Sequence, residues 1–505
     1  MRINQLKIGV ILSYVSMAAS TVISIVYTPV MLRLLGQSEY GLYSLSSSVV
    51  SYLSLLSLGF GSAYIRYYSK YNKNDDQVGV AKLNALFLTV FTILAAIALL
   101  AGIVLVLNTD LVLGGKLTNA ELSKSSILMS FMVVNIVLTF INSVFDSYVT
   151  AHEQYLFQKV LKLLTTVLNP FLVLPLLLMG YKSISLTLVT TSLTFISLLI
   201  NINYCRKKLH MQFNFHNMDF KLLKEIGYFS FFIFINMIVD QINWSVDKFI
   251  LGKYLGTTAV AIYSVGSQIN SYYLTFSTSI SSVFIPRVNR LVVEGNKQKE
   301  ITELFTKVGR IQFMILWLIL VNFAFYGQYF INKWAGEGYE TSYYVALLLI
   351  APVTIPLIQN LGIEIQRAMN MHQFRSIVYL LIAIINVFIS IILCQYLGEI
   401  GVALGTGISL LIGNGLIMNI YYHKKMKIDI PYFWYNIFKF LPGIVISVVL
   451  SAIVKFFIRG NTFSTFVIGI VITSLFTVLG YWFLGMNNYE KGLVRNITNK
   501  FKRGA

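Results

Sequence analysis

The amino-acid sequence predicts an all-α polytopic membrane protein. Of its 505 residues, 56% are apolar and only 12% are charged, and the mean hydropathy is +0.72. A soluble domain carries about a quarter charged residues, so this composition excludes a soluble globular protein. The apolar residues form long runs, such as 163–178 and 466–479, that do not alternate as the strands of a membrane β-barrel do. The spans are therefore expected to be helices.

A bilayer core about 30 Å thick takes about 20 apolar residues per helix. Apolar runs between polar breaks predict about fourteen spans, the first of which follows Arg2 and Lys7 and shows no convincing signal-peptide cleavage site. The predicted spans lie near residues 8–34, 42–66, 79–107, 125–149, 157–180, 184–204, 226–252, 258–286, 306–331, 342–367, 374–396, 400–422, 432–457 and 462–485.

The distribution of lysine and arginine predicts which way the spans face. With these spans, 30 of the 39 basic residues fall on the side of the two termini and 9 on the opposite side. Cytoplasmic connections carry the excess of positive charge in membrane proteins. We therefore expect a multi-pass protein of the bacterial cytoplasmic (inner) membrane with both termini in the cytoplasm, and we attribute most of the net charge of +19 to topology rather than to nucleic-acid binding.

An internal repeat is visible when the sequence is shifted by 220 residues. Residues 34–54 then align with 254–274 and share identical residues such as Gly36 and Gly256. A weaker match aligns His152-Glu153-Gln154-Tyr155 with Met371-His372-Gln373-Phe374. An offset of six spans keeps both copies in one orientation, so two parallel six-helix halves are expected to surround a central cavity.

The repeat predicts the division of the chain. We expect an N-terminal six-helix lobe at residues 1–205, a cytoplasmic linker at 206–220, and a C-terminal six-helix lobe at 221–423. Residues 424–505 are expected to form two additional transmembrane helices and a basic cytoplasmic tail.

Three stretches carry a resemblance to a known family: residues 34–43 (LLGQSEYGLY), residues 57–63 (SLGFGSA) and residues 247–256 (DKFILGKYLG). Together with the length and the fourteen spans, they resemble the Wzx-type oligosaccharide flippases, in the superfamily that contains the MATE exporters and the lipid II flippase MurJ. The resemblance implies a flippase that moves an undecaprenyl-pyrophosphate-type (polyprenyl-linked) oligosaccharide repeat unit from the cytoplasmic to the outer leaflet, for capsule or O-antigen polysaccharide biosynthesis. A polysaccharide polymerase and chain-length machinery are the protein partners that it implies.

A pyrophosphate crossing the membrane needs cationic side chains in a hydrated cavity. The candidate pyrophosphate-binding residues are Arg33, Arg66, Lys248, Lys253 and Arg287. Arg33 and Lys253 superpose in the repeat at the outer ends of their spans, which runs against the usual charge bias. The alternative for each is a snorkelling anchor that reaches lipid phosphates, and Lys248 could instead pair with a nearby aspartate.

Acidic residues inside spans are candidates for coupling transport to Na⁺ or H⁺, because protonation or ion binding removes the cost of a buried charge. Asp240, Trp244 and Asp247 fall on one helical face deep in the predicted seventh span, which we expect to face the cavity. Asp146 and Glu364 lie near the cytoplasmic ends of their spans. For Glu364 a local salt bridge with Arg367 is the alternative, and for Asp240 it is a structural ion pair with Lys248 or Arg33.

We expect alternating access driven by an ion gradient or the membrane potential, without ATP hydrolysis, since no Walker-type glycine loop is present in the sequence. A cation-coupled multidrug exporter of the MATE type is the alternative. An enzyme is not expected: the five histidines lie in predicted cytoplasmic connections, and no catalytic or metal-binding cluster is visible. Beyond a coupling ion, no cofactor is expected.

Overall fold

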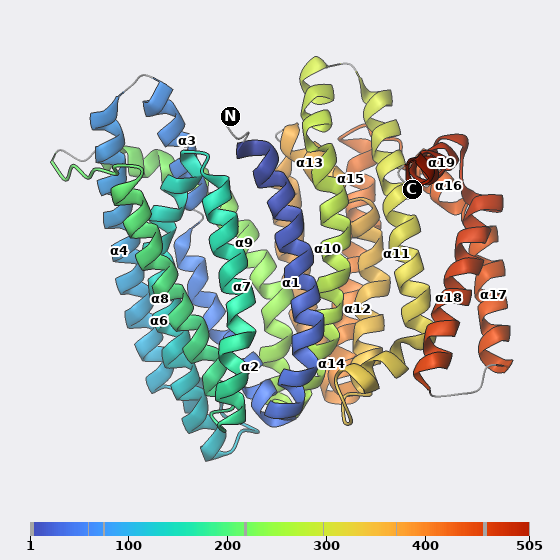
Figure 1. Ribbon diagram of the computed structural model, residues 1–505, viewed down its shortest axis with the longest axis horizontal. Coiled ribbons are helices and arrows are strands. Elements are labelled where there is room, and N and C mark those ends of the chain that lie inside the picture. The colour runs from blue at the N-terminus through green and yellow to red at the C-terminus, as the bar shows by residue number, and fades with distance from the viewer. Residues whose placement is uncertain are drawn as a thin grey trace. The chain divides into compact units, whose positions relative to one another are not determined.

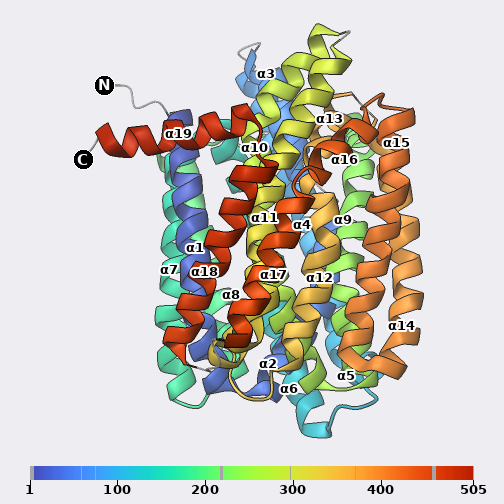
Figure 2. The same cartoon turned by 90° about the vertical axis from the view of Figure 1, so that its right-hand side faces the viewer.

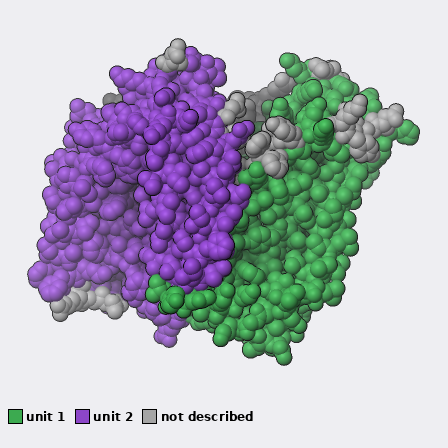
Figure 3. All heavy atoms as spheres, turned by 180° about the vertical axis from the view of Figure 1, so that it is seen from behind, with its two compact units in different colours: residues 1–264, 394–399 green, residues 265–393, 400–505 purple. Residues whose placement is uncertain are grey.

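The computed structural model describes residues 5–58, 60–73, 76–216, 220–295, 297–369, 371–457 and 462–503. All regular secondary structure within these ranges is helical (Figure 1), which confirms the predicted all-α fold. The helices separate into two compact units, which Figure 3 colours by residue. Unit 1 comprises residues 1–264 and 394–399, and unit 2 comprises residues 265–393 and 400–505.

Unit 1 contains α1 (Gln5–Leu35), α2 (Gln37–Val50), the 3₁₀ segment η1 (Ser51–Ser57), α3 (Phe60–Lys73), α4 (Gln77–Leu107), α5 (Thr109–Leu113), α6 (Asn119–Ala151), α7 (Tyr155–Leu178), α8 (Ser183–Lys207) and α9 (Phe220–Tyr254). Helix α10 (Thr257–Glu294) begins in unit 1 and continues in unit 2. Helix α9, which corresponds to the predicted seventh span, thus packs with unit 1. The repeat-based boundaries at 205 and 221 stay a prediction, and residues 217–219 of the expected linker lie outside the described residues.

Unit 2 contains α11 (Gln298–Trp334), α12 (Thr341–Ile358), α13 (Leu361–Ala368), most of α14 (His372–Leu410), the π-helical η2 (Leu411–Met418), α15 (Asn419–Lys424), α16 (Ile430–Phe438), α17 (Leu441–Phe457), α18 (Phe463–Gly480), the π-helical η3 (Tyr481–Gly485) and α19 (Asn488–Arg503). Helix α19 runs across the direction of α17 and α18 (Figure 2).

Ten helices in the described ranges are long and apolar enough to cross a membrane, so this is a multi-span membrane protein. The longest apolar helical stretch, Gln373–Lys424, reverses direction at Gly398, where φ is 58°. Asn386 donates a hydrogen bond to Thr406 at 3.3 Å across this reversal, so the stretch forms two antiparallel passes. The predicted second span is broken, because η1 and Leu58 (φ 50°) separate α2 from α3. The total of fourteen spans stays a prediction.

The predicted repeat has local counterparts in the structure, at two helix junctions of unit 1 and at ring pairs in each unit. Gly36 joins α1 to α2 with a φ of 77°, and the superposed Gly256 joins α9 to α10 with a φ of 94°. These left-handed conformations are accessible to glycine at little cost, which explains why both copies carry it. Stacked ring pairs 47 residues apart also recur: Phe157 on Tyr204 (ring centroids 3.8 Å apart) in unit 1 and Phe374 on Tyr421 (4.2 Å) in unit 2.

Aromatic side chains form the core of unit 1 between α3, α4 and α6. Tyr64 is fully buried, meets Phe87 edge to face at 5.1 Å and donates a hydrogen bond to Asn84 at 2.5 Å. Phe91 packs against Phe140 at 6.4 Å one turn further along. Burial of such rings stabilises the unit by their large apolar area, while the Tyr64 hydroxyl keeps a partner.

A second contact ties three helix ends of unit 1 together around Glu39 on α2. Lys124 of α6 lies 2.5 Å from this carboxylate, and the hydroxyl of Ser183, the first residue of α8, donates to it at 2.5 Å. Burial by itself raises the pKa of Glu39, but the hydrogen bonds from Lys124 and Ser183 and the charge of Lys124 outweigh it and hold the pKa below its usual value.

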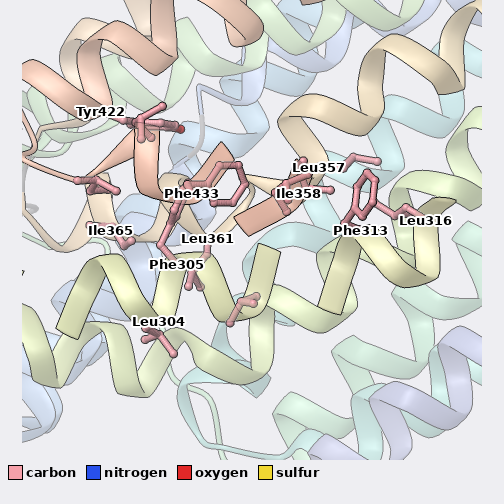
Figure 4. Close-up of a cluster of buried hydrophobic side chains, with 14 of the residues drawn as sticks. Leu304, Phe305, Phe313, Leu316, Leu357, Ile358, Leu361, Ile365, Tyr422 and Phe433 are labelled. Carbon is pink, nitrogen blue, oxygen red and sulfur yellow. The ribbon is translucent and has the colours of Figure 1, made fainter. Parts of the chain in front are cut away.

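The core of unit 2 is built around α11 (Figure 4). Phe305 is fully buried and packs on Phe433 of α16, with ring centroids 4.9 Å apart. Leu357 and Ile358, at the end of α12, and Leu361 of α13 join the same cluster. This cluster therefore connects α11 to α12, α13 and α16.

A buried ion pair fastens the C-terminal helices of unit 2 to α11. Arg310 and Glu490 are each 2% exposed, and the guanidinium donates to both carboxylate oxygens, at 2.6 and 2.8 Å. The same guanidinium donates to the carbonyl oxygen of Asn436, at the end of α16, and to that of Gly485 at 2.8 Å. Its planar fork of donors thus satisfies groups from three segments, α16, η3 and α19, at once.

Candidate functional site

A polar cavity of about 500 Å³ lies within unit 1 between α1, α6, α7 and α8. All four helices are among those apolar enough to cross a membrane. Polar side chains in such helices are costly when they face lipid, so their gathering in one place indicates a hydrated, functional space.

Each helix contributes a stripe of polar residues at helical spacing. Such intervals of three or four residues place side chains on one helical face. The stripes are Ser20, Ser24 and Tyr27 on α1; Thr139, Asn142 and Asp146 on α6; Gln158, Lys162, Thr165 and Asn169 on α7; and Thr190, Thr194, Ser197 and Asn201 on α8. The sequence signal was present in these intervals, although of these residues only Asp146 was predicted as a site residue.

Hydrogen bonds join the stripes across the cavity. Gln158 of α7 donates to the Asp146 carboxylate of α6 at 2.9 Å. Asn201 of α8 donates to Asn142 of α6 at 2.8 Å, and Asn169 of α7 donates to a threonine of α8 at 3.3 Å. The Lys162 side chain also lines the cavity.

This arrangement can bind a polar ligand, and the charge of the cavity can change. Amides and hydroxyls supply neutral donors and acceptors, Lys162 supplies a positive charge, and Asp146 supplies a group that can hold a proton or a cation. In the part of the chain that the structure describes, three or more metal-ligating side chains do not come together. A single carboxylate with neutral oxygens is therefore the cation-binding chemistry that this cavity offers.

The four predicted acidic residues have different surroundings, each described within its own unit. Asp146 lines the unit 1 cavity, whereas Glu364 lies in unit 2 and pairs with Arg367 at 2.9 Å, which is the local salt bridge considered from the sequence. On α9, Asp240 is exposed while Asp247 is 2% exposed and accepts a hydrogen bond from Tyr263. The two therefore differ in environment despite their shared helical face. The side chain of Trp244 lies outside the described residues.

The predicted basic residues are also dispersed, and none of them is among the residues that line the described cavity. Arg33, Arg66 and Lys253 are exposed in unit 1, Lys248 is half-buried on α9, and Arg287 is exposed in unit 2. Their roles as pyrophosphate ligands or as anchors stay predictions. Lys162 is the basic residue of the cavity that the sequence analysis did not single out.

Comparison with known proteins agrees with this architecture. Residues 6–292 match the family model described as "Polysaccharide biosynthesis protein". The "Putative O-antigen transporter" of Shigella flexneri is 20% identical over 327 residues, which cover 64% of this chain and 75% of the relative. The "Uncharacterized membrane protein EpsK" of Bacillus subtilis is 21% identical over 421 residues, 80% of each chain.

Solved structures share the fold. A structure of the lipid II flippase MurJ in an inward closed conformation gives a TM-score of 0.71 at 16% identity, covering 93% of this chain and 98% of that one. An inward-facing multidrug resistance transporter of the MATE family gives 0.63 at 12% identity, covering 79% and 96%. The shared fold agrees with the family model, which covers more than half of the chain, so this membrane protein belongs to the polysaccharide biosynthesis protein family, as its resemblance to the Wzx-type flippases predicted.

Proposed function

We propose that this protein is a flippase that moves a polyprenyl-pyrophosphate-linked oligosaccharide repeat unit from the cytoplasmic to the outer leaflet of the inner membrane. The polymer served is a capsule- or O-antigen-type polysaccharide. The observation that carries the proposal is the polar cavity of Asp146 and Lys162, held between four apolar helices in a chain of this family. A hydroxylated, anionic headgroup needs such a polar environment to cross the hydrocarbon region.

A MATE-type drug exporter is the second candidate, and the acidic residue in a cavity of unit 1 is compatible with it. The extent of the structural likeness favours the flippase. The MATE structure covers 79% of this chain, whereas the MurJ structure covers 93%. A lipid-linked cargo is also the better explanation for a cavity that contains a lysine.

The deciding experiment uses a strain that lacks this protein. Polyprenyl-linked lipids are extracted and analysed by mass spectrometry, and surface polymer is measured in parallel. We expect a complete sugar repeat unit to accumulate on its lipid carrier while surface polymer is lost. Normal lipids together with a new drug sensitivity would instead assign the protein to the exporters.

Ion coupling is proposed to use Asp146, because a carboxylate in a hydrated cavity can gain and lose a cation or proton as the cavity opens and closes. Asp146→Asn should keep the Gln158 contact and abolish the dependence of transport on the ion gradient or membrane potential. Asp240→Asn, on the exposed acid of α9, is the matched comparison. Gradient dependence that survives both substitutions would exclude these acids as coupling groups.

Arg33 and Lys253, at the repeat-related helix ends, are the proposed phosphate contacts outside the cavity. The Arg33→Ala/Lys253→Ala double variant should reduce surface polymer at native expression while the protein stays folded, since both side chains are exposed. A normal amount of surface polymer would instead indicate that both residues are lipid anchors.

A further inference from the structure

A second cavity of about 600 Å³ lies in unit 1 at the end where α3 and α6 finish and α4 begins. The loop after α8 passes over it and contributes Leu209, His210 and Gln212. The positive-inside distribution predicts that this end faces the cytoplasm. The cavity shares no lining residue with the Asp146 cavity.

Buried polar contacts hold this second cavity in shape. Asn84, which is fully buried, donates to the carbonyl oxygen of Gln212 at 2.8 Å and so fixes the loop on α4. The hydroxyl of Tyr148 donates to the Leu209 carbonyl at 3.3 Å, and Tyr68 and His152 share a hydrogen bond of 3.0 Å. The site is thus assembled from three helices and a tethered loop, and it opens to the surface at exposed residues such as Gln77 and Gln212.

Two of the five non-glycine residues with a positive φ in the described ranges line this cavity. Glu153 has a φ of 57° and His210 a φ of 50°, and both residues line it. L-residues other than glycine pay a free-energy cost in this left-handed region, and such strain is characteristic of functional sites. Both residues follow helix C-termini, where a left-handed residue commonly ends a helix, and a glycine would relieve the strain at either position.

The chemistry of the lining defines the ligand class. The described lining residues include neither lysine nor arginine but include the carboxylate of Glu153, which disfavours an anion. Burial lowers the pKa of His152, despite its hydrogen bond to the Tyr148 carbonyl, which favours the neutral imidazole. Amides, imidazoles and phenols therefore dominate a lining that is too polar for a lipid chain and lacks a metal-binding cluster among its described side chains.

We propose that this cavity is a saccharide-binding site, which holds a neutral sugar ring of the lipid-linked cargo at the cytoplasmic end of unit 1 before translocation. The side-chain amides of Asn72, Gln77 and Gln212 and the His210 imidazole can donate to and accept from ring hydroxyls, while the internal contacts of Asn84, Tyr148 and His152 hold the lining in place. The identification of the ligand as cargo rests on the proposed flippase function.

The test uses the purified full-length protein in lipid nanodiscs. Saturation-transfer NMR is recorded with the methyl glycosides of glucose, galactose, mannose, N-acetylglucosamine and N-acetylgalactosamine. We expect at least one of them to bind the unaltered protein. Absence of binding by all five would overturn the proposal.

The matched variants exploit the strained backbone. His210→Gly and Glu153→Gly each remove a lining side chain while relieving strain, so the melting temperature should stay equal or rise while glycoside affinity falls about tenfold. Lys427→Gly, at an exposed lysine with a φ of 57° in unit 2, is the control and should leave affinity unchanged. If a glycine variant fails to fold, Gln77→Ala, at an exposed lining position, serves the same purpose.

Unchanged affinity in the folded lining variants would place the bound glycoside elsewhere and overturn the proposal. The result is separable from the flippase assignment. Suppose that lipid-linked sugar accumulates in the deletion strain while no glycoside binds the protein. This result would refute the saccharide site and leave the flippase proposal intact. Glycoside binding without any accumulating lipid-linked sugar would overturn the identification of the ligand as cargo.

Discussion

Removing one partner of the Arg310–Glu490 pair should destabilise unit 2 strongly. Arg310→Met leaves the Glu490 carboxylate, 2% exposed, without its two guanidinium hydrogen bonds, and it also removes the donor to the Gly485 carbonyl. Breaking one side of a buried ion pair costs about 3–5 kcal/mol, because the remaining charge stays desolvated. For a unit of this size such a loss corresponds to a decrease in melting temperature of about 10 °C.

The matched variant replaces both partners, as Arg310→Met with Glu490→Leu. No uncompensated charge then stays buried, so the double variant should lose less stability than the sum of the two single variants, with a coupling of about 2 kcal/mol or more. The carbonyl groups of Asn436 and Gly485 still lose a donor, so full recovery is not expected.

Thermal unfolding is followed with a thiol-reactive dye. Ser451 is fully buried on α17, so Ser451→Cys reports on unit 2 when Cys205 and Cys394 are replaced by alanine. The protein that keeps its native Cys205 and lacks the Ser451→Cys substitution serves as the reporter for unit 1. If the single and double variants unfold at the same temperature as the parent, or if their effects simply add, the pair does not fasten α16, η3 and α19 to α11.

The remaining predictions concern one contact in each unit. Because the pKa of Glu39 is lowered by its partners, its ion pair contributes stability above the ordinary glutamate value of 4.5 and loses it as the pH falls below that value through the folded-state pKa. Glu39→Gln should therefore cost about 1 kcal/mol at neutral pH, with a melting-temperature difference that shrinks on acidification; a pH-independent difference would refute the assignment. In unit 2, a β-carbon on Gly480 would lie 2.6 Å from the carbonyl oxygen of Gly443, at the crossing of α17 and α18. Gly480→Ala should lower stability by about 1–3 kcal/mol, whereas Gly492→Ala, where the added methyl meets no atom within 4 Å, should not destabilise the protein; equal melting curves for the two variants would contradict close helix packing at Gly480.

The sequence alone determined the fold class and the family. Lipid imposes a composition and a helix length that appear in every span, so the all-α membrane fold follows from hydropathy without knowledge of any contact. Local ion pairs could also be predicted from the sequence, since Glu364 and Arg367 lie three residues apart on one helix and their side chains therefore meet. Gly36 and Gly256 were identifiable as repeat positions because a left-handed helix junction constrains a single residue.

Only the tertiary structure decided which distant groups meet. Arg310 and Glu490 are 180 residues apart, and no pattern in the sequence indicates that they form a pair. The polar stripes of α1, α6, α7 and α8 were each readable from residue spacing, but helix rotation and packing determine that they face one shared cavity. The same holds for Asp240 and Asp247, which share a helical face although one is exposed and the other buried against Tyr263. Periodicity determines which residues share a face of a helix. Burial depends on which neighbouring segment covers each turn, and this is determined by packing between segments far apart in the chain.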